Sequence, residues 1–124
     1  MKADTTRTDK QISGLLSEQR AEAFLQAKGL VPVERNFLCK SGEIDLIMRD
    51  RESLVFVEVR FRKNANFGSA LETVNRSKQK KVIAAAQFYL RKQGLSANIA
   101  IRFDVVGITG DDIQWVSSAF DAEF

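Results

Sequence analysis

The stretch that decides the fold is GEIDLIMRDRESLVFVEVRF, residues 42–61. It contains two apolar segments of strand type, 43–49 and 54–61, separated by the polar tetrapeptide at 50–53. A polar connection this short joins two neighbouring antiparallel strands, and its position sets their register. We therefore expect a hairpin in which the numbers of two facing residues sum to 103.

The inferred register divides the side chains of the hairpin between two faces. Charged residues gather on one face, where Asp45 is expected opposite Glu58 and Glu43 is expected opposite Arg60. The other face is uniformly apolar and is expected to belong to the core: Ile44, Leu46, Met48, Val55, Val57, Val59 and Phe61.

The two opposed carboxylates need compensation, because they repel one another and because an ionised acid on an apolar strand is costly. A divalent cation bridging Asp45 and Glu58 would supply it, with waters and a substrate phosphate completing the coordination. The alternative is that Arg60 and Arg62 neutralise the acids, and that Glu43 and Arg60 form an ordinary cross-strand ion pair.

Histidine is absent from the 124 residues, and cysteine occurs once. These facts exclude Ser-His-Asp and Cys-His catalysis as well as zinc sites built from imidazole or thiolate. A metal ion here must be held by oxygen ligands, which suit magnesium, manganese or calcium. The lone Cys39 cannot form an internal disulfide, and its apolar-flanked position predicts a buried or half-buried thiol.

The rest of the chain follows from hydrophobic periodicity and from Gly and Pro signals. The length suits one domain, and the order α-β-β-β-α-β-β predicts an α/β domain over 13–124 with a mixed β-sheet flanked by helices. The expected ranges are a flexible tail over 1–12, a helix from Ser13 or Leu15 to Lys28, strands at 33–39, 43–49 and 54–61, a loop around Gly68, a helix at 75–92, and strands at 99–109 and 113–116.

Positive charge is concentrated in one part of the chain. The formal net charge is only +3, yet residues 60–92 hold nine Lys or Arg and a single acid, Glu72. A solvated helix face with a polar loop explains such a run, and so does a polyanionic partner. No apolar run approaches the ~20 residues that span a bilayer, and the N-terminus lacks a secretory signal, so we expect a cytoplasmic protein without a membrane partner.

Asp45 followed by Glu58-Val59-Arg60 resembles the signature of the PD-(D/E)xK nuclease superfamily, in which an acid precedes Glu-x-Lys on the next strand. The wider text is more specific and is similar to the bacterial YraN-like family, uncharacterised protein family 0102, whose members resemble archaeal Holliday-junction resolvases in fold. The resemblance covers residues 13–120. The matching segments are Gly14-x3-Glu18-x2-Ala21-x2-Phe24-Leu25, Arg35-Asn36, GEIDLI at 42–47, FVEVRFR at 56–62, SKQKK at 77–81 and RFDVV at 102–106.

The resemblance implies a restriction-endonuclease-like core and a set of site residues. Asp45 and Glu58 would hold Mg²⁺ or Mn²⁺, with the Val59 carbonyl as a third ligand. Glu18 matches an additional acid of many superfamily members, although a structural role as a buried partner for an arginine is the alternative. Gln79 lies near the position where resolvase-like members place a polar helper.

The sequence departs from the superfamily pattern at Arg60, where lysine is usual. Lysine can lose its proton when buried, whereas arginine stays charged and can only stabilise negative charge. Two interpretations remain open. Either water activated at the cation attacks phosphorus in line while Arg60 stabilises the developing charge, or the chain binds nucleic acid without cutting it.

The expected function is therefore a metal-dependent endonuclease that hydrolyses phosphodiester bonds in DNA, with branched DNA as the suggested substrate and DNA favoured over RNA. Alternatives are a catalytically silent nucleic-acid-binding module and a protein-interaction domain with ion-paired acids. Resolvase relatives act as dimers, which leaves a homodimer open, although no dimer face is readable. The residues expected to contact nucleic acid are Arg62, Lys63, Arg76, Lys78, Gln79 and Lys81.

Overall fold

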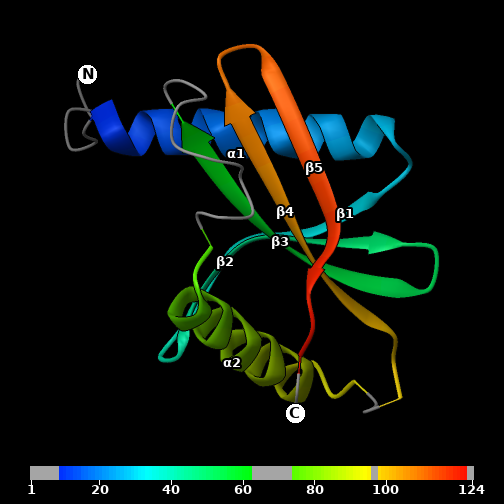
Figure 1. Ribbon diagram of the computed structural model, residues 1–124. Coiled ribbons are helices and arrows are strands. Elements are labelled where there is room, and N and C mark those ends of the chain that lie inside the picture. The colour runs from blue at the N-terminus through cyan, green and yellow to red at the C-terminus, as the bar shows by residue number, and fades with distance from the viewer. Residues whose placement is uncertain (1–8, 63–73, 96–97, 123–124) are drawn as a thin grey trace, which may run out of the picture.

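The computed structural model describes residues 9–62, 74–95 and 98–122 (Figure 1). Lys63 and the loop around Gly68 lie outside these ranges, as does the start of the expected tail. The order of elements confirms the predicted α-β-β-β-α-β-β arrangement. The elements are α1 (Asp9–Ala27), β1 (Val31–Cys39), β2 (Gly42–Asp50), β3 (Ser53–Arg62), α2 (Arg76–Lys92), β4 (Ile101–Thr109) and β5 (Asp112–Phe120).

Two boundaries differ from the sequence-based expectation. Helix α1 begins at Asp9, before the expected start at Ser13 or Leu15. Strand β5 continues to Phe120 instead of ending at Val116. Ser118 has a positive φ of 54°, and the register between β4 and β5 shifts near it, so the strand absorbs a bulge and then resumes pairing.

The five strands form one mixed sheet in the order β1-β2-β3-β4-β5. Strands β3 and β4 are parallel, and the other neighbouring pairs are antiparallel. A parallel pair needs a long crossover, and α2 lies within it. The sheet lies between α1 and α2 (Figure 1), which confirms the predicted α/β core. In the described part of the chain no helix is long and apolar enough to cross a membrane.

Each helix covers its own apolar cluster on the sheet, so both faces of the central strands are buried. The α1-side cluster consists of Ala21, Leu25, Leu30, Leu46, Met48, Val55, Val57, Val106 and Ile108. The α2-side cluster consists of Phe37, Ile44, Ile47, Leu54, Phe56, Val82, Ala85, Ala86, Tyr89 and Phe103, with the half-buried Cys39 packed against it as expected.

The register of the central hairpin is confirmed from Asp50↔Ser53 to Leu46↔Val57, and every pair sums to 103. The ladder then ends. The expected backbone pairs Asp45 with Glu58 and Glu43 with Arg60 are therefore wrong. Beyond this point β2 and β3 diverge, with β3 continuing beside β4 toward α1 while β2 runs toward α2 (Figure 1). Asp45 lies at the fork between the two strands.

The alternation of side chains is interrupted in both β1 and β2 at the level of the fork. Arg35 bonds to α1, whereas Phe37 packs in the α2-side cluster. Leu46 belongs to the α1-side cluster, whereas Ile44 belongs to the α2-side cluster, so the prediction that Ile44 shares a face with Leu46 is wrong. Asn36, with φ of 51°, adopts the left-handed conformation that permits this change of side. We call the change at Asn36 and Asp45 the side switch.

The prediction that Phe61 is a core residue is also wrong, because its side chain is 48% exposed. Phe61 is the next-to-last residue of β3. Among the described side chains of α1, the first to join the α1-side cluster is Ala21. The α1-side cluster therefore does not extend to Phe61, although the alternation of residues along β3 continues that far.

Asp104 on β4 shows how this fold treats a buried acid that has a structural role. It is fully buried and accepts four hydrogen bonds: two from the Arg102 guanidinium, one from Trp115 Nε1 and one from the Ser118 backbone N–H. Arg102 also donates to Asp50 at 3.0 Å, which joins the end of β2 to β4. Every oxygen of Asp104 is satisfied, and the β5 bulge is thereby held in place.

Candidate active site

Glu58 on β3 is buried in the opposite manner. Its exposed fraction is 1%, and neither carboxylate oxygen has a hydrogen-bond partner among the described residues. An unsatisfied buried carboxylate is costly, and native proteins rarely leave one without a reason. The contrast with Asp104 marks Glu58 as a group arranged to receive something else.

Asp45 reaches the same place from the fork. Its Oδ2 accepts a hydrogen bond of 2.8 Å from the backbone N–H of Val59, the residue that follows Glu58. The side chain thus takes up a backbone donor at the point where the ladder between β2 and β3 has ended. Burial raises the pKa of Asp45, and the Val59 N–H opposes that rise. Asp45 was expected opposite Glu58 by backbone pairing, and its side chain is instead held by this bond to the residue after Glu58, near enough for its charge to raise the pKa of Glu58.

Burial and mutual repulsion keep Glu58 close to neutrality. Burial raises its pKa from 4.5 to about 8, with the charge of Asp45 as the next cause, while the charges of Lys78 and Arg60 oppose the rise. The favourable charges do not outweigh the cost of burial. Ionising both acids together is therefore costly, and a bound cation would offset that cost.

Glu18 of α1 lies near enough to Asp45 to be affected by its charge. Its Oε1 is buried without a hydrogen-bond partner, and its pKa is raised to about 7 by burial and then by the charge of Asp45. A side-chain hydrogen bond between Asn36 and the Glu18 carboxylate opposes this rise in pKa. The ion pair from α1 to an arginine is made by Glu22, which binds Arg35 at 2.9 and 3.1 Å. Arg35 thus pairs with Glu22, one helical turn after Glu18, and its charge also lowers the pKa of Glu18.

Lys78 is the site residue whose role sequence reasoning missed. Its Nζ lies 3.4 Å from Glu58 Oε1, although it was expected only to contact nucleic acid. It stands in the first turn of α2, where its backbone N–H donates to Asn75 Oδ1 at 2.9 Å and so caps the helix. The contact joins two elements far apart in sequence, and no local pattern indicates it.

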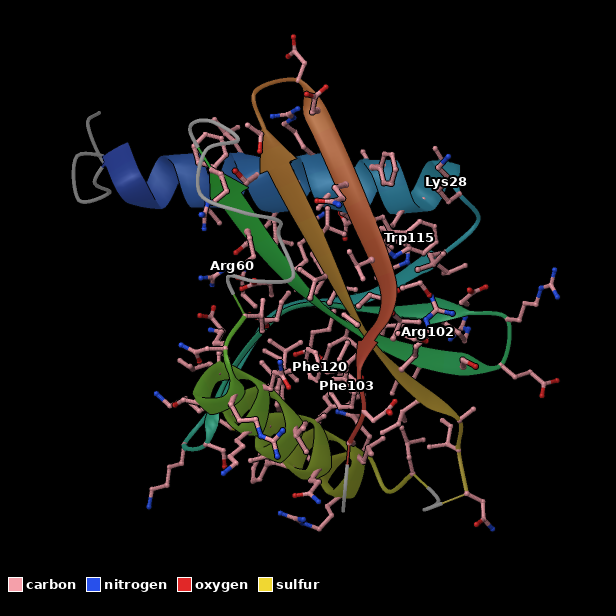
Figure 2. The ribbon with its side chains drawn as sticks, viewed as in Figure 1. Lys28, Arg60, Arg102, Phe103, Trp115 and Phe120 are labelled. Atoms are coloured by element: carbon pink, nitrogen blue, oxygen red, sulfur yellow. The ribbon has the colours of Figure 1, made fainter. Side chains whose placement is uncertain are left out.

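Arg60 lies on β3 between the levels of α1 and α2 (Figure 2) and is half-buried. Its positive charge lowers the pKa of both Asp45 and Glu58, in each case less than Lys78 does. Arg60 is therefore part of the electrostatic environment of the acid pair. Arg62, two residues further on, is half-buried at the end of β3.

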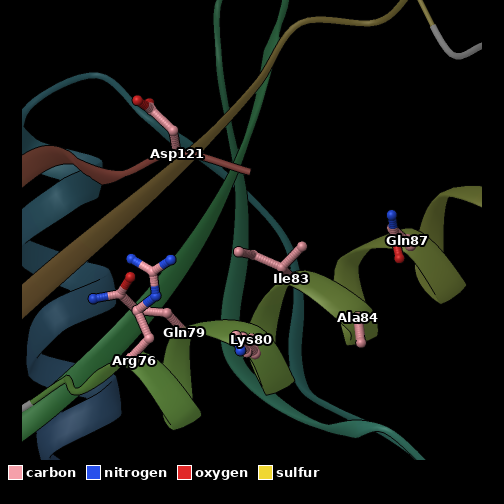
Figure 3. Close-up of a pocket in the computed structure, with 7 residues that line it drawn as sticks. All are labelled: Arg76, Gln79, Lys80, Ile83, Ala84, Gln87 and Asp121. Carbon is pink, nitrogen blue, oxygen red and sulfur yellow. The ribbon is translucent and has the colours of Figure 1, made fainter. Parts of the chain in front are cut away.

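The other residues expected to contact nucleic acid lie on α2. Arg76 and Lys81 are exposed, while Gln79 is half-buried and donates to the Val74 carbonyl at 3.0 Å. A pocket of about 230 Å³ opens beside them (Figure 3) and is separate from the acid pair, which does not line it. Its lining consists of Arg76, Gln79, Lys80, Ile83, Ala84, Gln87 and Asp121.

The acid pair suits a hard divalent cation only with help from other oxygens. Within the described ranges, no three His, Cys, Asp or Glu side chains form a group that could hold a metal ion. Asp45 and Glu58 would therefore need the expected Val59 carbonyl, waters and a substrate oxygen, which matches the preference of Mg²⁺ for keeping several waters. The unsatisfied oxygens of Glu58 fit this requirement.

Together these features define an α/β protein with a restriction-endonuclease-like core and, at a fork of its sheet, a pair of acids of which Glu58 is buried and Asp45 half-buried. The chain belongs to the Uncharacterised protein family UPF0102, whose model matches residues 17–108. It is 53% identical over 108 residues to a UPF0102 protein of Saccharophagus degradans, covering 87% of this chain and 92% of that protein. It is 50% identical over 122 residues to one of Nitrosococcus oceani, covering 95% and 96%.

Proposed function

We propose that this protein is a metal-dependent endonuclease that hydrolyses phosphodiester bonds in DNA. The observation that carries the proposal is the Glu58 carboxylate, which is 1% exposed and lies beside Asp45, a half-buried acid. Among the described residues it is compensated by the 3.4 Å contact with Lys78, and its pKa is still raised. Burial of an acid with a strongly raised pKa lowers the stability of the fold and is typical of a functional site. Asp104 excludes the idea that the fold leaves its buried acids unsatisfied in general.

Each residue of the site has a role in this proposal. Asp45 and Glu58 would hold Mg²⁺ or Mn²⁺ together with the Val59 carbonyl, and Glu18 would hold water or the same ion from the α1 side. When bound, the cation would neutralise phosphate charge and lower the pKa of water at the site. Arg60 would stabilise the charge that develops on the phosphorane, because a guanidinium offers fixed donors to phosphate oxygens.

The exposed basic residues of α2 support a polyanionic substrate, and DNA is the polymer that we propose. Branched DNA follows from the similarity to resolvases noted for the sequence. The second candidate is a nucleic-acid-binding module that does not cut. Arg60 favours it, because a residue that stays charged cannot take the place of a lysine that acts as a base.

A cleavage assay tests the proposal. Purified protein is incubated with end-labelled linear, forked and four-way-junction DNA, with matched RNA, in Mg²⁺, in Mn²⁺ and in EDTA. We expect cation-dependent cuts that are strongest on branched DNA. Binding without cuts in either cation would favour the silent module, and the absence of both binding and cuts would leave only the fold.

Arg60 can be tested by two substitutions. If it stabilises charge at the phosphate, Arg60→Ala should lower the cleavage rate by roughly 10²–10³-fold while cation affinity persists. Arg60→Lys should retain or improve cleavage, because it restores the usual residue of the motif. Single-turnover rates and calorimetric titration with Mn²⁺ measure the two effects. An unchanged rate in Arg60→Ala would assign this arginine to the stability of β3 alone.

The basic surface of α2 can be tested through salt dependence. Lys78 contacts Glu58, so the informative residues are Arg76 and Lys81, which are exposed. Reversing both to Glu should weaken DNA binding and reduce the slope of log affinity against log salt by about 0.9 per lost phosphate contact. The control reverses Arg49 and Arg91, which are exposed outside the first turn of α2. Equal slopes in the two double variants would show that the surface is merely solvated.

A further inference from the structure

The contact between Lys78 and Glu58 joins a long, partly exposed side chain, that of Lys78, to a buried one with little freedom, that of Glu58. Glu58 is 1% exposed and projects from a strand that is paired on its β4 side, so its carboxylate has little freedom. The Lys78 side chain is 36% exposed, and four rotatable bonds connect its ammonium to α2. The backbone of Lys78 is anchored by Asn75, whereas its Nζ contacts Glu58 at the longer distance of 3.4 Å.

The ion pair between Lys78 and Glu58 compensates the acids in the metal-free protein, yet it is loose enough for a cation to replace it. The ammonium lies 3.4 Å from Glu58 Oε1, whereas a charge-assisted hydrogen bond is usually about 2.7–2.9 Å long, so the contact is a loose one. The ammonium nevertheless compensates both acids, since its charge opposes the rise in the pKa of Asp45 as well as that of Glu58. A divalent cation between the same two acids would make this compensation redundant and would repel the ammonium.

The first turn of α2 supplies a second observation. It contains Arg76 and Lys78 and no acid, although the N-terminus of a helix carries partial positive charge and is normally complemented by acids. An ammonium that leaves Glu58 therefore moves into a region of positive potential. A phosphate of the substrate is the group that would stabilise it there.

We propose that Lys78 is a displaceable counter-ion of Glu58, which occupies the acid pair in the metal-free protein and is released toward substrate phosphate when a divalent cation binds. This inference rests on the proposed function. Its consequence is coupling between two ligands. Cation binding frees a positive charge for DNA, and DNA, by retaining that charge, favours cation binding by the same factor.

Calorimetric titration with Mg²⁺ and electron paramagnetic resonance with Mn²⁺ test the first half, because neither depends on cleavage. Lys78→Met removes the competing charge and should bind either cation about tenfold more tightly or more, as expected for losing one close charge in a partly buried site. Lys80→Met is the matched control: it removes the same charge from an exposed position on the same helix, and its affinity should change much less. Lys78→Gln keeps a donor for Glu58 and replaces Lys78→Met if that variant does not fold.

The second half is tested with Ca²⁺, which is used here to bind without supporting cleavage, and with four-way-junction DNA. The factor by which Ca²⁺ raises DNA affinity should be several-fold larger in the wild type than in Lys78→Met, and it should be unaltered in Lys80→Met. If the wild type binds cations while Lys78→Met binds them equally or more weakly, the counter-ion role is overturned and the proposed function stands. If folded wild type, Lys78→Met and Lys78→Gln all fail to bind cations at millimolar concentration, the proposed function fails as well.

Discussion

Asp45→Asn should abolish cation-dependent cleavage, lowering the rate by at least about 10³-fold, because charge neutralisation by a bound cation contributes several kcal/mol to the transition state. The substitution is mild for the fold, since the amide oxygen of asparagine can still accept the hydrogen bond from the Val59 N–H. Addition of Mg²⁺ should raise the melting temperature of the wild type and leave that of the variant unchanged, because an ion that binds only the folded state stabilises it.

The control for this experiment is Asp111→Asn, which makes the same chemical change in the exposed turn between β4 and β5. It should retain both cleavage and the thermal response to Mg²⁺. Full cleavage by Asp45→Asn would remove this acid from the site. A thermal response to Mg²⁺ that survives in the variant would place the cation elsewhere in the protein.

Glu58→Gln should make the metal-free protein more stable at alkaline pH while it destroys cation binding. The pKa of Glu58 is raised from 4.5 to about 8 in the folded state, so the folded protein binds the proton more tightly than the unfolded chain. The stability gained from that proton is complete below pH 4.5 and is lost as the pH rises through 8. Glutamine mimics the protonated acid at every pH, and the difference at pH 9 should be on the order of a few kcal/mol.

Thermal melts in EDTA between pH 5 and pH 9 measure this effect. The melting temperatures of Glu58→Gln and the wild type should be similar near pH 5 and should separate as the pH rises. Millimolar Mg²⁺ should then narrow the gap by stabilising the wild type alone. Glu52→Gln, in the exposed turn of the hairpin, is the matched control and should show no gap. A variant less stable than the wild type at pH 9 would mean that the attraction between Lys78 and ionised Glu58 exceeds the desolvation cost of burying that charge.

Much of the fold follows from local patterns in the sequence. The polar tetrapeptide at 50–53 sets the register of the hairpin, and every backbone pair from Asp50↔Ser53 to Leu46↔Val57 agrees with it. The helices follow from apolar periodicity and from glycines placed after each one. Asp45 and Glu58 stand out because acids are unexpected on such apolar strands, and that argument needs no knowledge of how the strands end.

The errors arise where three-dimensional packing overrides the period of a strand. Strict alternation placed Ile44 beside Leu46 and placed Phe61 in the core, whereas the side switch and the limited apolar cover of α1 decide otherwise. The contact of Lys78 with Glu58 depends on how α2 packs on the sheet, and the bond from the Ser118 backbone N–H to Asp104 depends on a bulge in β5. Neither has a signature in the spacing of residues.

The side switch has a consequence for how this protein can change over evolution. It occupies matching levels of two neighbouring strands, so a one-residue insertion or deletion in β1 would need a simultaneous and equal change in β2 to keep Phe37 and Ile44 in the same cluster. Asp45 is part of that arrangement rather than of a loop that can lengthen freely. New specificities are therefore more accessible through exchange of single side chains, as at Arg60, than through remodelling of the backbone around the acids.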